Sequence, residues 1–383
     1  MANSIHWGEL TAEQFLAEYW QKKPLLIKNA LPHFTDTIDA NELAGLAMEE
    51  EIESRIISQD KANNWHVSHG PFDSFDSFGE TDWTLLVQAV NNWSRATDQL
   101  ISLFNFIPRW RIDDVMVSYS TPNGGVGSHL DQYDVFILQG AGQRRWRVGS
   151  KNPDIDTLLP HPDLKQVVDF KPVIDEITER GDLLYIPPNH PHNGVSIENS
   201  LNFSIGFQAP SSQDLWSSFA DKVIDEQSGE QRFTDQDRQV TNASSLLAKN
   251  DMNALKAFML KQLDNDDMFA AFISQYLTQS HHTLELLIPV EPFTGDQVSS
   301  MCEDETIHFT PVSGIKSLIT LHPTPCLFIN GDKFVLSDDN VEFAQFLTKS
   351  ESLTTKNARS FIDCLKNKQL LTMVLNKGYW YIE

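Results

Sequence analysis

The stretch that decides the fold is VGSHLDQYDVFIL, residues 126–138. We interpret it as a β-strand, in which residues i and i+2 point to the same face, so that the imidazole of His129 and the carboxylate of Asp131 converge on one point. One more imidazole from another strand would place two histidines and one carboxylate on one side of a metal ion. That ligand set leaves coordination positions open for substrate and dioxygen, as in non-haem iron(II) oxygenases. A His-x-Asp pattern alone is weak, because it often arises by chance.

A candidate third ligand lies in PPNHPHNG, residues 187–194, directly before a predicted strand. Both His190 and His192 of this segment have the strand parity that would direct them to the same face. Local geometry therefore leaves both histidines open as the third ligand.

An arginine in an apolar setting extends the pattern. The predicted strand QRRWRVG, residues 143–149, alternates so that Arg144 shares a face with Trp146 and Val148. A guanidinium in such a setting requires a carboxylate partner, because an unpaired buried charge is costly. A bidentate arginine–carboxylate pair is a strong and directional contact. Arg144 is therefore a candidate for binding a carboxylate near the metal.

Two further predicted strands each have one small, polar face and one apolar face, as the wall of a cavity would. The polar faces carry Asn202, Ser204 and Gly206 in the strand 201–208, and Ser118 and Ser120 in the strand 115–120. We expect these faces to line the space beside the metal.

Short strands dominate the region from 114 to 210 and indicate a double-stranded barrel or jelly roll. They are expected at 115–120, 126–138, 143–149, 183–186, 193–197 and 201–208. The triplet Gly140-Ala141-Gly142 indicates a hairpin between two of them. In the preceding part we expect helices at 11–20, 41–48, 83–91 and 96–104, and strands at 25–27, 51–58 and 65–68.

Beyond Pro210 the pattern becomes helical and then mixed. Helical periodicity runs through 215–224, 243–247, 255–263 and 268–277. From residue 283 onward, helices alternate with strand pairs such as 326–329 with 334–336 and 369–375 with 379–382. We therefore predict an α+β chain with three regions, 1–210, 211–280 and 281–383.

The charge balance is strongly acidic, with 53 Asp and Glu against 29 Lys and Arg, which gives a formal net charge of −24 for 383 residues. Direct nucleic-acid binding is not expected, because phosphates require basic side chains. One explanation is that the excess acids only maintain solubility. The more specific explanation is that the surface attracts a cationic macromolecular substrate.

No apolar run is long enough to cross a bilayer, and the N-terminus lacks the basic and apolar regions of a secretory signal. The three cysteines, Cys302, Cys326 and Cys364, are too few and too widely spaced for a disulfide framework or a zinc ribbon. We therefore expect a cytoplasmic protein without a membrane partner.

Together these motifs resemble the JmjC ribosomal oxygenases. The resemblance lies in HLDQYDVFILQG (129–140), GQRRW (142–146), and GDLLYIPP (181–188) with PHNG (191–194). The segment FLAEYWQKKPLLI (15–27) is similar to the N-terminal signature of the same group. The match is specific because three separated stretches agree with the family in order and spacing, and it resembles most the bacterial branch, the ribosomal protein arginine hydroxylases.

The resemblance implies an iron(II) site formed by His129, Asp131 and His192, with His192 favoured over His190 by its Pro-His-Asn-Gly context. The implied reaction consumes dioxygen and 2-oxoglutarate, releases succinate, and hydroxylates a side-chain carbon of an arginine. The implied substrate is the large-subunit ribosomal protein numbered sixteen, a basic protein that an acidic surface would attract.

The same resemblance assigns the cosubstrate contacts. Arg144 lies where the family has the basic residue for the distal carboxylate of 2-oxoglutarate, and Ser118 matches a second contact. Asn202, on the predicted cavity wall, is a further candidate for contacting the cosubstrate.

The order of regions in the family implies a helical dimerisation region at 211–280, and hence a homodimer, followed by a winged-helix-like domain at 281–383. From Glu291 onward acids outnumber Lys and Arg, so we do not expect this domain to bind DNA. Its expected role is structural, or contact with another protein.

Other interpretations stay open at this point. The same chemistry could act on a histidine of a ribosomal protein or demethylate a lysine, or the chain could be a non-catalytic cupin-like protein that binds a basic partner. Among the remaining histidines, His161 is expected at the surface, and His281 and His282 in a solvated loop. The NGG at 123–125 is interpreted as a turn and not a phosphate loop, since no Lys-Ser/Thr follows it.

Overall fold

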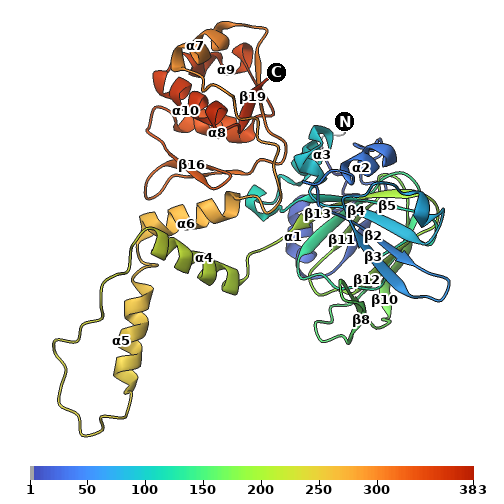
Figure 1. The fold of residues 1–383 in the computed structure, drawn as a ribbon, viewed down its shortest axis with the longest axis horizontal. Helices are drawn as coiled ribbons and strands as arrows, with labels where there is room; N and C mark the ends of the chain where they lie inside the picture. Colours follow the sequence, from blue (N-terminus) through green and yellow to red (C-terminus); the bar gives the residue numbers. More distant parts are fainter. Residues whose placement is uncertain (1–3) are drawn as a thin grey trace. The chain divides into compact units, whose positions relative to one another are not determined.

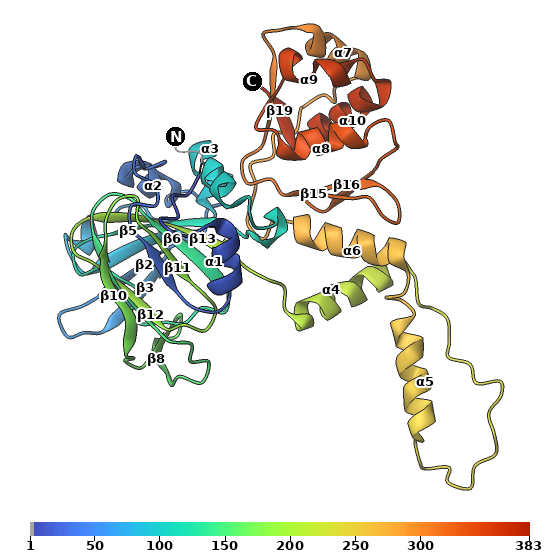
Figure 2. The ribbon, with the colours of Figure 1, turned by 180° about the vertical axis from the view of Figure 1, so that it is seen from behind.

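The computed structural model describes residues 4–383, apart from the side chains of residues 358, 359 and 362. Its contacts divide the chain into two units. The first contains the chain up to Ala209 and two short later segments, His282–Glu285 and Val312–Gly314, and the second contains the rest. Figure 1 and Figure 2 show the first unit as strands wound into a barrel and the second as mainly helical. Among the described residues, we find no helix with the length and apolar character that a membrane span requires.

Antiparallel strands form the barrel of the first unit. The larger sheet has the order β1-β11-β6-β13-β5-β4-β2-β3, the smaller has the order β10-β7-β12, and β8 and β9 form a separate hairpin. This is the expected double-stranded β-helix. The strands are β1 (Leu25–Ile27), β2 (Ser54–Gln59), β3 (Trp65–His69), β4 (Trp83–Val87), β5 (Val115–Ser120), β6 (Asp134–Gln139), β7 (Arg144–Gly149), β8 (Thr157–His161), β9 (Leu164–Val167), β10 (Pro172–Thr178), β11 (Leu183–Ile186), β12 (His192–Ser196) and β13 (Ser200–Phe207). The helices of this unit are α1 (Ala12–Glu18), α2 (Ala40–Leu46) and α3 (Arg95–Asp98), with short 3-10 segments η1 (Asp76–Phe78), η2 (Val90–Asn92), η3 (Gln99–Phe104) and η4 (Arg109–Arg111).

One face of the large sheet packs against α1. The ring of Phe15 lies 5.4 Å from that of Phe136 in β6 and 4.9 Å from that of Tyr185 in β11, and Phe15 is fully buried. A capping box between Thr11 and Gln14 begins this helix. Burying a phenylalanine side chain contributes about 1.5–3 kcal/mol. Because aromatic rings fill this face, the opposite face of the same strands is left for a cavity.

A buried polar network ties the end of α1 to the first residue of β6. The backbone N–H of Gln21 donates to the hydroxyl of Tyr185 (2.7 Å), and that hydroxyl donates to the carboxylate of Asp134 (2.6 Å). The side-chain amide of Gln21 donates to the other oxygen of the same carboxylate (2.9 Å). Burial raises the pKa of Asp134. The network fixes the point at which β6 begins, three residues after Asp131.

The segment around His129 differs from the prediction. Strand β6 begins at Asp134, so the predicted strand 126–138 is wrong in its first half. There the chain makes one isolated bridge, between His129 and His192. Gly127 has a φ of +78°, a left-handed conformation that a regular strand excludes. Long-range pairing, and not strand alternation, therefore positions the candidate ligands of this segment.

Two other local predictions in the first unit are wrong. Residues 83–91, predicted as a helix, form β4 and a 3-10 turn. Strand β4 is buried throughout between β2 and β5, and a short, continuous apolar run does not distinguish a strand from a helix. The triplet Gly140-Ala141-Gly142 does not close a hairpin, because it carries the chain from β6 in the large sheet to β7 in the small one. Strands β8 and β10 escape prediction because most of their residues are exposed.

The second unit combines helices with two small sheets, β18-β14-β19 and β15-β16-β17. Its hydrophobic core includes Phe309, Leu327 and Trp380. Its helices are α4 (Ser212–Asp225), α5 (Lys249–Leu260), α6 (Asp266–Thr278), α7 (Gly295–Glu303), α8 (Val341–Lys349), α9 (Thr355–Ile362) and α10 (Leu365–Asn376). Its strands are β14 (His308–Pro311), β15 (Ser317–Thr320), β16 (Cys326–Ile329), β17 (Asp332–Val335), β18 (Leu353–Thr354) and β19 (Trp380–Ile382).

Two predictions in the second unit are wrong. Residues 369–375, predicted as a strand, lie within α10, where the buried positions Leu370, Leu371, Val374 and Leu375 follow helical spacing. Residues 243–247, predicted as a helix, are irregular and precede α5. The three cysteines are free thiols.

Candidate metal centre

Three side chains that can ligate a metal converge in the first unit. The ligand atoms of His129, Asp131 and His192 all lie within 4.8 Å of one another. The Asp131 Oδ2 atom is 3.5 Å from His192 Nε2 and 3.9 Å from His129 Nε2. Within the described part of the chain, no other group of at least three His, Cys, Asp or Glu residues meets this distance criterion.

Backbone pairing holds the two histidines together. The N–H of His129 donates to the carbonyl of His192, and the N–H of His192 donates to the carbonyl of His129, both at 2.9 Å. The imidazole rings consequently lie 4.1 Å apart between centroids. Asp131 is fixed in turn, because its carbonyl accepts from the N–H of Asn189 (2.8 Å).

Each imidazole has one nitrogen engaged and one available. The Nδ1 atom of His129 is 3.0 Å from the carbonyl of Gly127, and that of His192 is 2.9 Å from the carbonyl of His190. An Nδ1–H that donates to a carbonyl leaves the Nε2 lone pair free for a metal, and this second contact also orients the ring. Both Nε2 atoms point to the Asp131 carboxylate.

His190, the rival ligand, lies apart from this cluster. Its Nδ1 atom is 3.1 Å from the carbonyl of Pro188, and its side chain does not line the cavity that contains the other three. Asn189, which directly precedes His190, has a φ of +63° and so turns the chain at this point. The geometry therefore groups His192, and not His190, with His129 and Asp131.

The electrostatics of the cluster suit a cation. Burial and the neighbouring His192 lower the pKa of His129 to about 4, so that its imidazole is neutral near pH 7. Burial would raise the pKa of Asp131, but the adjacent imidazoles of His192 and His129 hold it below its ordinary value. A neutral His129 imidazole and an ionised Asp131 carboxylate are protonation states that metal binding requires.

The cluster lies in a cavity of about 530 Å³ that the first unit lines. The cavity wall includes Ser118, Asn202, Ser204 and Gly206, in agreement with the predicted polar faces. Ser118 and Asn202 are cross-strand neighbours in β5 and β13. The amide nitrogen of Asn202 donates to Gln139 Oε1 (2.9 Å), and its buried oxygen has no hydrogen-bond partner.

Arg144 occupies one end of this cavity. It is 5% exposed, and its guanidinium donates to the hydroxyls of Ser120 and Ser200, the latter at 3.4 Å. Its buried Nε–H has no acceptor, and among the described residues no carboxylate forms an ion pair with it. Burial lowers its pKa to about 9, so the group is still cationic near pH 7. The predicted need for a carboxylate partner is thus not met by the protein itself.

Ser120 and Ser200 are contacts that sequence reasoning missed. Alternation predicts that Ser120 shares the polar face with Ser118, but a contact was expected only for Ser118. The structure places Ser120 beside the Arg144 guanidinium, while Ser118 lies one step along the same strand. Strand alternation places both serines on one face, but it does not show which of them Arg144 contacts.

Close packing at one glycine shapes the site. A Cβ at Gly194 would lie 2.6 Å from the indole ring of Trp146, which lines the cavity and lies 6.2 Å from the His192 ring between centroids. The carbonyl of Gly194 in turn approaches Gly125, where a Cβ would lie 2.6 Å from it. These approaches explain the glycine of the Pro-His-Asn-Gly stretch and one glycine of the NGG turn.

The other end of the cavity is acidic. Glu53, Asp113 and Asp114 line it, together with Tyr133 and His282. The nearby Asp131 charge, together with burial, raises the pKa of Tyr133. His282 lies 3.8 Å from Asp114 and 3.7 Å from Glu53, so its prediction as a solvated loop residue is wrong. His282 belongs to the first unit although it is distant from the rest of that unit in sequence. No local sequence pattern therefore indicates this contact.

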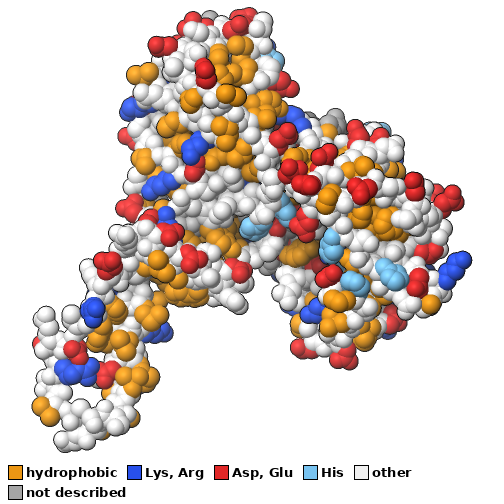
Figure 3. Space-filling view, viewed as in Figure 1, with side chains coloured by type: hydrophobic (Ala, Val, Ile, Leu, Met, Phe, Trp, Pro, Cys, Tyr) orange, Lys and Arg blue, Asp and Glu red, His pale blue; other side chains and the backbone are white. Residues whose placement is uncertain are grey.

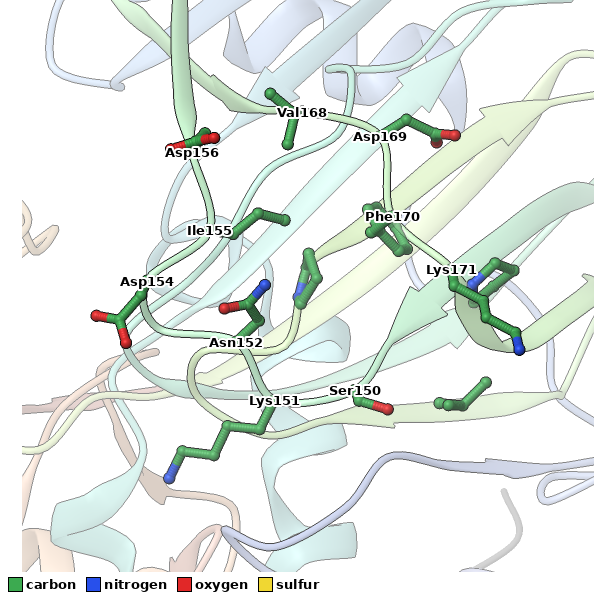
Figure 4. A pocket seen from close by; sticks show the side chains of 13 residues that line it. Ser150, Lys151, Asn152, Asp154, Ile155, Asp156, Val168, Asp169, Phe170 and Lys171 are labelled. Atoms are coloured by element: carbon green, nitrogen blue, oxygen red, sulfur yellow. The ribbon is translucent and has the colours of Figure 1, made fainter.

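A second, more open hollow of about 630 Å³ lies between the segments 150–156 and 168–173 (Figure 4). Its wall mixes aspartates with Lys151 and Lys171 around Phe170. None of the three clustered ligands lines it, so the chemistry belongs to the smaller cavity. His161 ends β8 and accepts from the N–H of Asp163 (3.2 Å), away from the cluster.

Family models match both units of the chain. One described as a JmjC domain matches residues 99–215, and one described as a ROXA-like winged helix matches residues 261–381. The ribosomal protein uL16 3-hydroxylase of Escherichia coli (strain K12) is 40% identical over 383 residues, which cover 99% of this chain and 98% of that protein. A probable ribosomal oxygenase of Haemophilus influenzae is 32% identical over 372 residues, which cover 94% and 90%.

Solved structures agree with these matches. The X-ray structure of E. coli ycfD has a TM-score of 0.92 and 39% identity, and the match covers 98% of this chain and 99% of that one. The structure of YcfD with cobalt and 2-oxoglutarate has a TM-score of 0.89 and 38% identity, with the same coverage. The matches confirm the expected fold, a JmjC barrel followed by a winged-helix domain.

Replacing Gly194 by alanine is expected to destabilise the metal centre. The added Cβ must displace the Trp146 ring, and overpacking of this kind costs about 1–3 kcal/mol. Urea unfolding measures the loss of stability, and titration with Co²⁺ measures the loss of metal affinity. Gly45→Ala is the matched control, because nothing lies within 4 Å of a Cβ there and its helix favours alanine. A Gly194→Ala variant with wild-type stability and cobalt affinity would contradict the close packing.

Proposed function

The chain belongs to the JmjC-domain ribosomal oxygenases, and from that premise we propose that it is an iron(II)- and 2-oxoglutarate-dependent hydroxylase of an arginine in the ribosomal protein uL16. One observation carries the proposal: a single cavity combines a His-Asp-His cluster, an arginine without a carboxylate partner at one end, and carboxylates at the other. The E. coli relative is named a uL16 3-hydroxylase, which supports the choice of substrate.

The donor set fits iron(II). His129, Asp131 and His192 would hold the ion through two neutral Nε2 atoms and one carboxylate oxygen, the set that non-haem iron(II) oxygenases use. When bound, the iron supplies the oxidation that couples decarboxylation of 2-oxoglutarate, to succinate and carbon dioxide, with insertion of one atom of dioxygen into a substrate C–H bond. The hydrogen bonds to the carbonyls of Gly127 and His190 hold both rings in the binding orientation.

The cosubstrate fits the end of the cavity that Arg144 occupies. A carboxylate there would accept from the guanidinium, which Ser120 and Ser200 hold in place and Trp146 covers at 5.8 Å. A charge-assisted contact in this buried setting is strong, because little water competes with it. Ser118 and Asn202 lie on the adjoining wall, and we propose them as further contacts to 2-oxoglutarate.

The acidic end of the cavity suits a cationic side chain. Glu53, Asp113 and Asp114 would attract the guanidinium of a substrate arginine and leave its aliphatic carbons toward the metal. The net charge of −24 would also steer a basic ribosomal protein to the enzyme. A substrate on the ribosome places the reaction in the cytoplasm.

We further propose that residues 211–280 form a homodimer contact. Helix α5 has no buried residue, although Met252, Leu255 and Met259 give it an apolar side, and Figure 3 shows apolar side chains along this helix. A second copy of the chain would cover that side. Replacing Leu255 and Met259 together by aspartate is expected to shift the sedimentation coefficient to that of a monomer. Unchanged sedimentation of the variant would argue against this contact.

The decisive test of the activity is mass spectrometry of uL16 after incubation with the enzyme, iron(II), 2-oxoglutarate and dioxygen. We expect one arginine to gain the mass of one oxygen atom, and the same residue to lack it in a deletion strain. Modification of a histidine, or loss of methyl groups from a lysine, would support the alternative substrates. Absence of succinate would support the non-catalytic alternative.

The two histidines of Pro-His-Pro-His provide a matched pair of variants. His192→Ala removes a proposed ligand and is expected to abolish iron binding and succinate formation, as are His129→Ala and Asp131→Ala. His190→Ala removes a buried imidazole two residues away that lies outside the cavity, so it should retain iron. Iron content by elemental analysis and succinate by mass spectrometry measure the effects. Retention of iron by His192→Ala, with loss in His190→Ala, would reverse the assignment.

Arg144→Ala is expected to raise the KM for 2-oxoglutarate about 10-fold to 100-fold, because it removes hydrogen bonds between charged groups worth about 1.5–3 kcal/mol. Its iron affinity should change little, since Arg144 is not a ligand. Arg145→Ala is the control, because Arg145 points to the opposite face of β7 and pairs with Asp175 at 2.7 Å. An unchanged KM for 2-oxoglutarate in Arg144→Ala would refute its role.

A further inference from the structure

A second arginine, Arg55, lines the cavity that contains the metal cluster. It lies in β2 and forms a cross-strand row with Leu86 in β4, Ser118 in β5 and Asn202 in β13. The residue is half-buried and lines the same cavity as the metal cluster. Its buried Nε–H has no hydrogen-bond acceptor among the described residues, where no carboxylate forms a close ion pair with it, although its charge acts on Asp131 at longer range.

The absence of an acceptor is costly, and so points to a ligand. A guanidinium has five N–H donors and no acceptor, and a buried donor that is left without an acceptor destabilises the folded chain. Carboxylates are available nearby, because Glu53, Asp113 and Asp114 line the same cavity. None of them lies within ion-pair distance of Arg55. The side chain therefore offers its donors to the cavity and not to the surrounding protein.

The cosubstrate is not the expected acceptor. Arg144 reaches the hydroxyls of Ser120 in β5 and Ser200 in β13, which places a carboxylate bound there over these two strands. In the cross-strand row, the backbone of Arg55 is three strand spacings from Asn202, roughly 14 Å. Arg55 thus belongs to the β2 side of the cavity.

The β2 side also carries the hairpin of β8 and β9. His69, the cross-strand neighbour of Arg55, lies 3.3 Å from Asp163 in the turn of that hairpin. Asp163 and Lys165 line the cavity beside Arg55. This side of the cavity therefore has a polar wall.

A cationic substrate side chain cannot satisfy Arg55, because like charges repel. The acceptor must come from a part of the substrate that carries no positive charge. A polypeptide offers such acceptors in its main-chain carbonyl groups, each with two lone pairs.

We propose that Arg55 binds main-chain carbonyl oxygens of the substrate polypeptide, and so sets the register in which the target side chain enters the cavity. The inference rests on the proposed function, because it takes a protein as the substrate. It divides recognition between two groups of residues. The carboxylates at the acidic end of the cavity select the charge of the side chain, and Arg55 positions the backbone that carries it.

Steady-state kinetics of the full-length enzyme on uL16 test the proposal. Arg55→Ala is expected to raise the KM for uL16 about 10-fold or more, as loss of a hydrogen bond from a charged donor does. The KM for 2-oxoglutarate and the iron content should stay at the wild-type values. Arg55→Lys should recover part of the loss, because it retains a charged donor without the planar fork. Arg145→Ala, on the outer face of β7, is the control for removal of a positive charge.

A backbone substitution in the substrate makes the test specific. In a synthetic uL16 fragment, replacing the amides beside the target residue one at a time by esters weakens single carbonyl acceptors. One such ester should raise the KM of the wild-type enzyme but not that of Arg55→Ala. An equal effect of every ester on both enzymes would overturn the proposal, as would a raised KM for 2-oxoglutarate or a loss of iron in Arg55→Ala. If the wild-type enzyme does not modify uL16 at all, the proposed function fails first, and that result is distinct from a wild-type KM in the variant.

Discussion

The site depends on one reciprocal pair of backbone hydrogen bonds, between His129 and His192. Each bond contributes only about 0.5–1.5 kcal/mol. Their effect is geometric, because they join the irregular segment before β6 in the large sheet to the first residue of β12 in the small sheet. Two further backbone hydrogen bonds flank this pair. The N–H of Asn123 donates to the carbonyl of Ser196, and the N–H of Asn189 donates to the carbonyl of Asp131. Through this join, residues that are more than sixty positions apart in sequence present their side chains to one point.

Charge is ordered along the cavity around that point. A buried arginine lies at one end, the His-Asp-His cluster between, and carboxylates line the other end. In a setting of low dielectric constant such an order discriminates strongly, because each charge is poorly screened. A dicarboxylate is attracted to the Arg144 end and repelled from the acidic end, and a cationic side chain behaves in the opposite way. The cosubstrate and the proposed cationic side chain would thereby be kept to different sides of the metal ligands.

Alternation within strands predicted much of the cavity, whereas contacts between distant segments could not be predicted. Asn202 and Ser118 were placed on the correct faces, because β5 and β13 are regular strands with one filled face. The convergence of His129 and Asp131 was predicted from a strand that does not exist there. The two side chains nevertheless converge, because the backbone pairing of His129 with His192 positions them. His282 and Arg55 carry no local pattern, since their positions depend on the tertiary fold.

The two arginines of the cavity show how environment separates the roles of identical side chains. Arg144 is almost fully buried and held by two hydroxyls, so it is preorganised for one small anion at a fixed place. Arg55 is half-buried without such supports, so it can follow a larger ligand at the edge of the cavity. The wall that carries Arg144 thus serves the reaction, and the wall that carries Arg55 serves recognition of the substrate. A related chain could change its substrate by altering β2 and the acidic end of the cavity. It would keep the metal ligands, because neither of these regions contributes an atom to the His-Asp-His cluster.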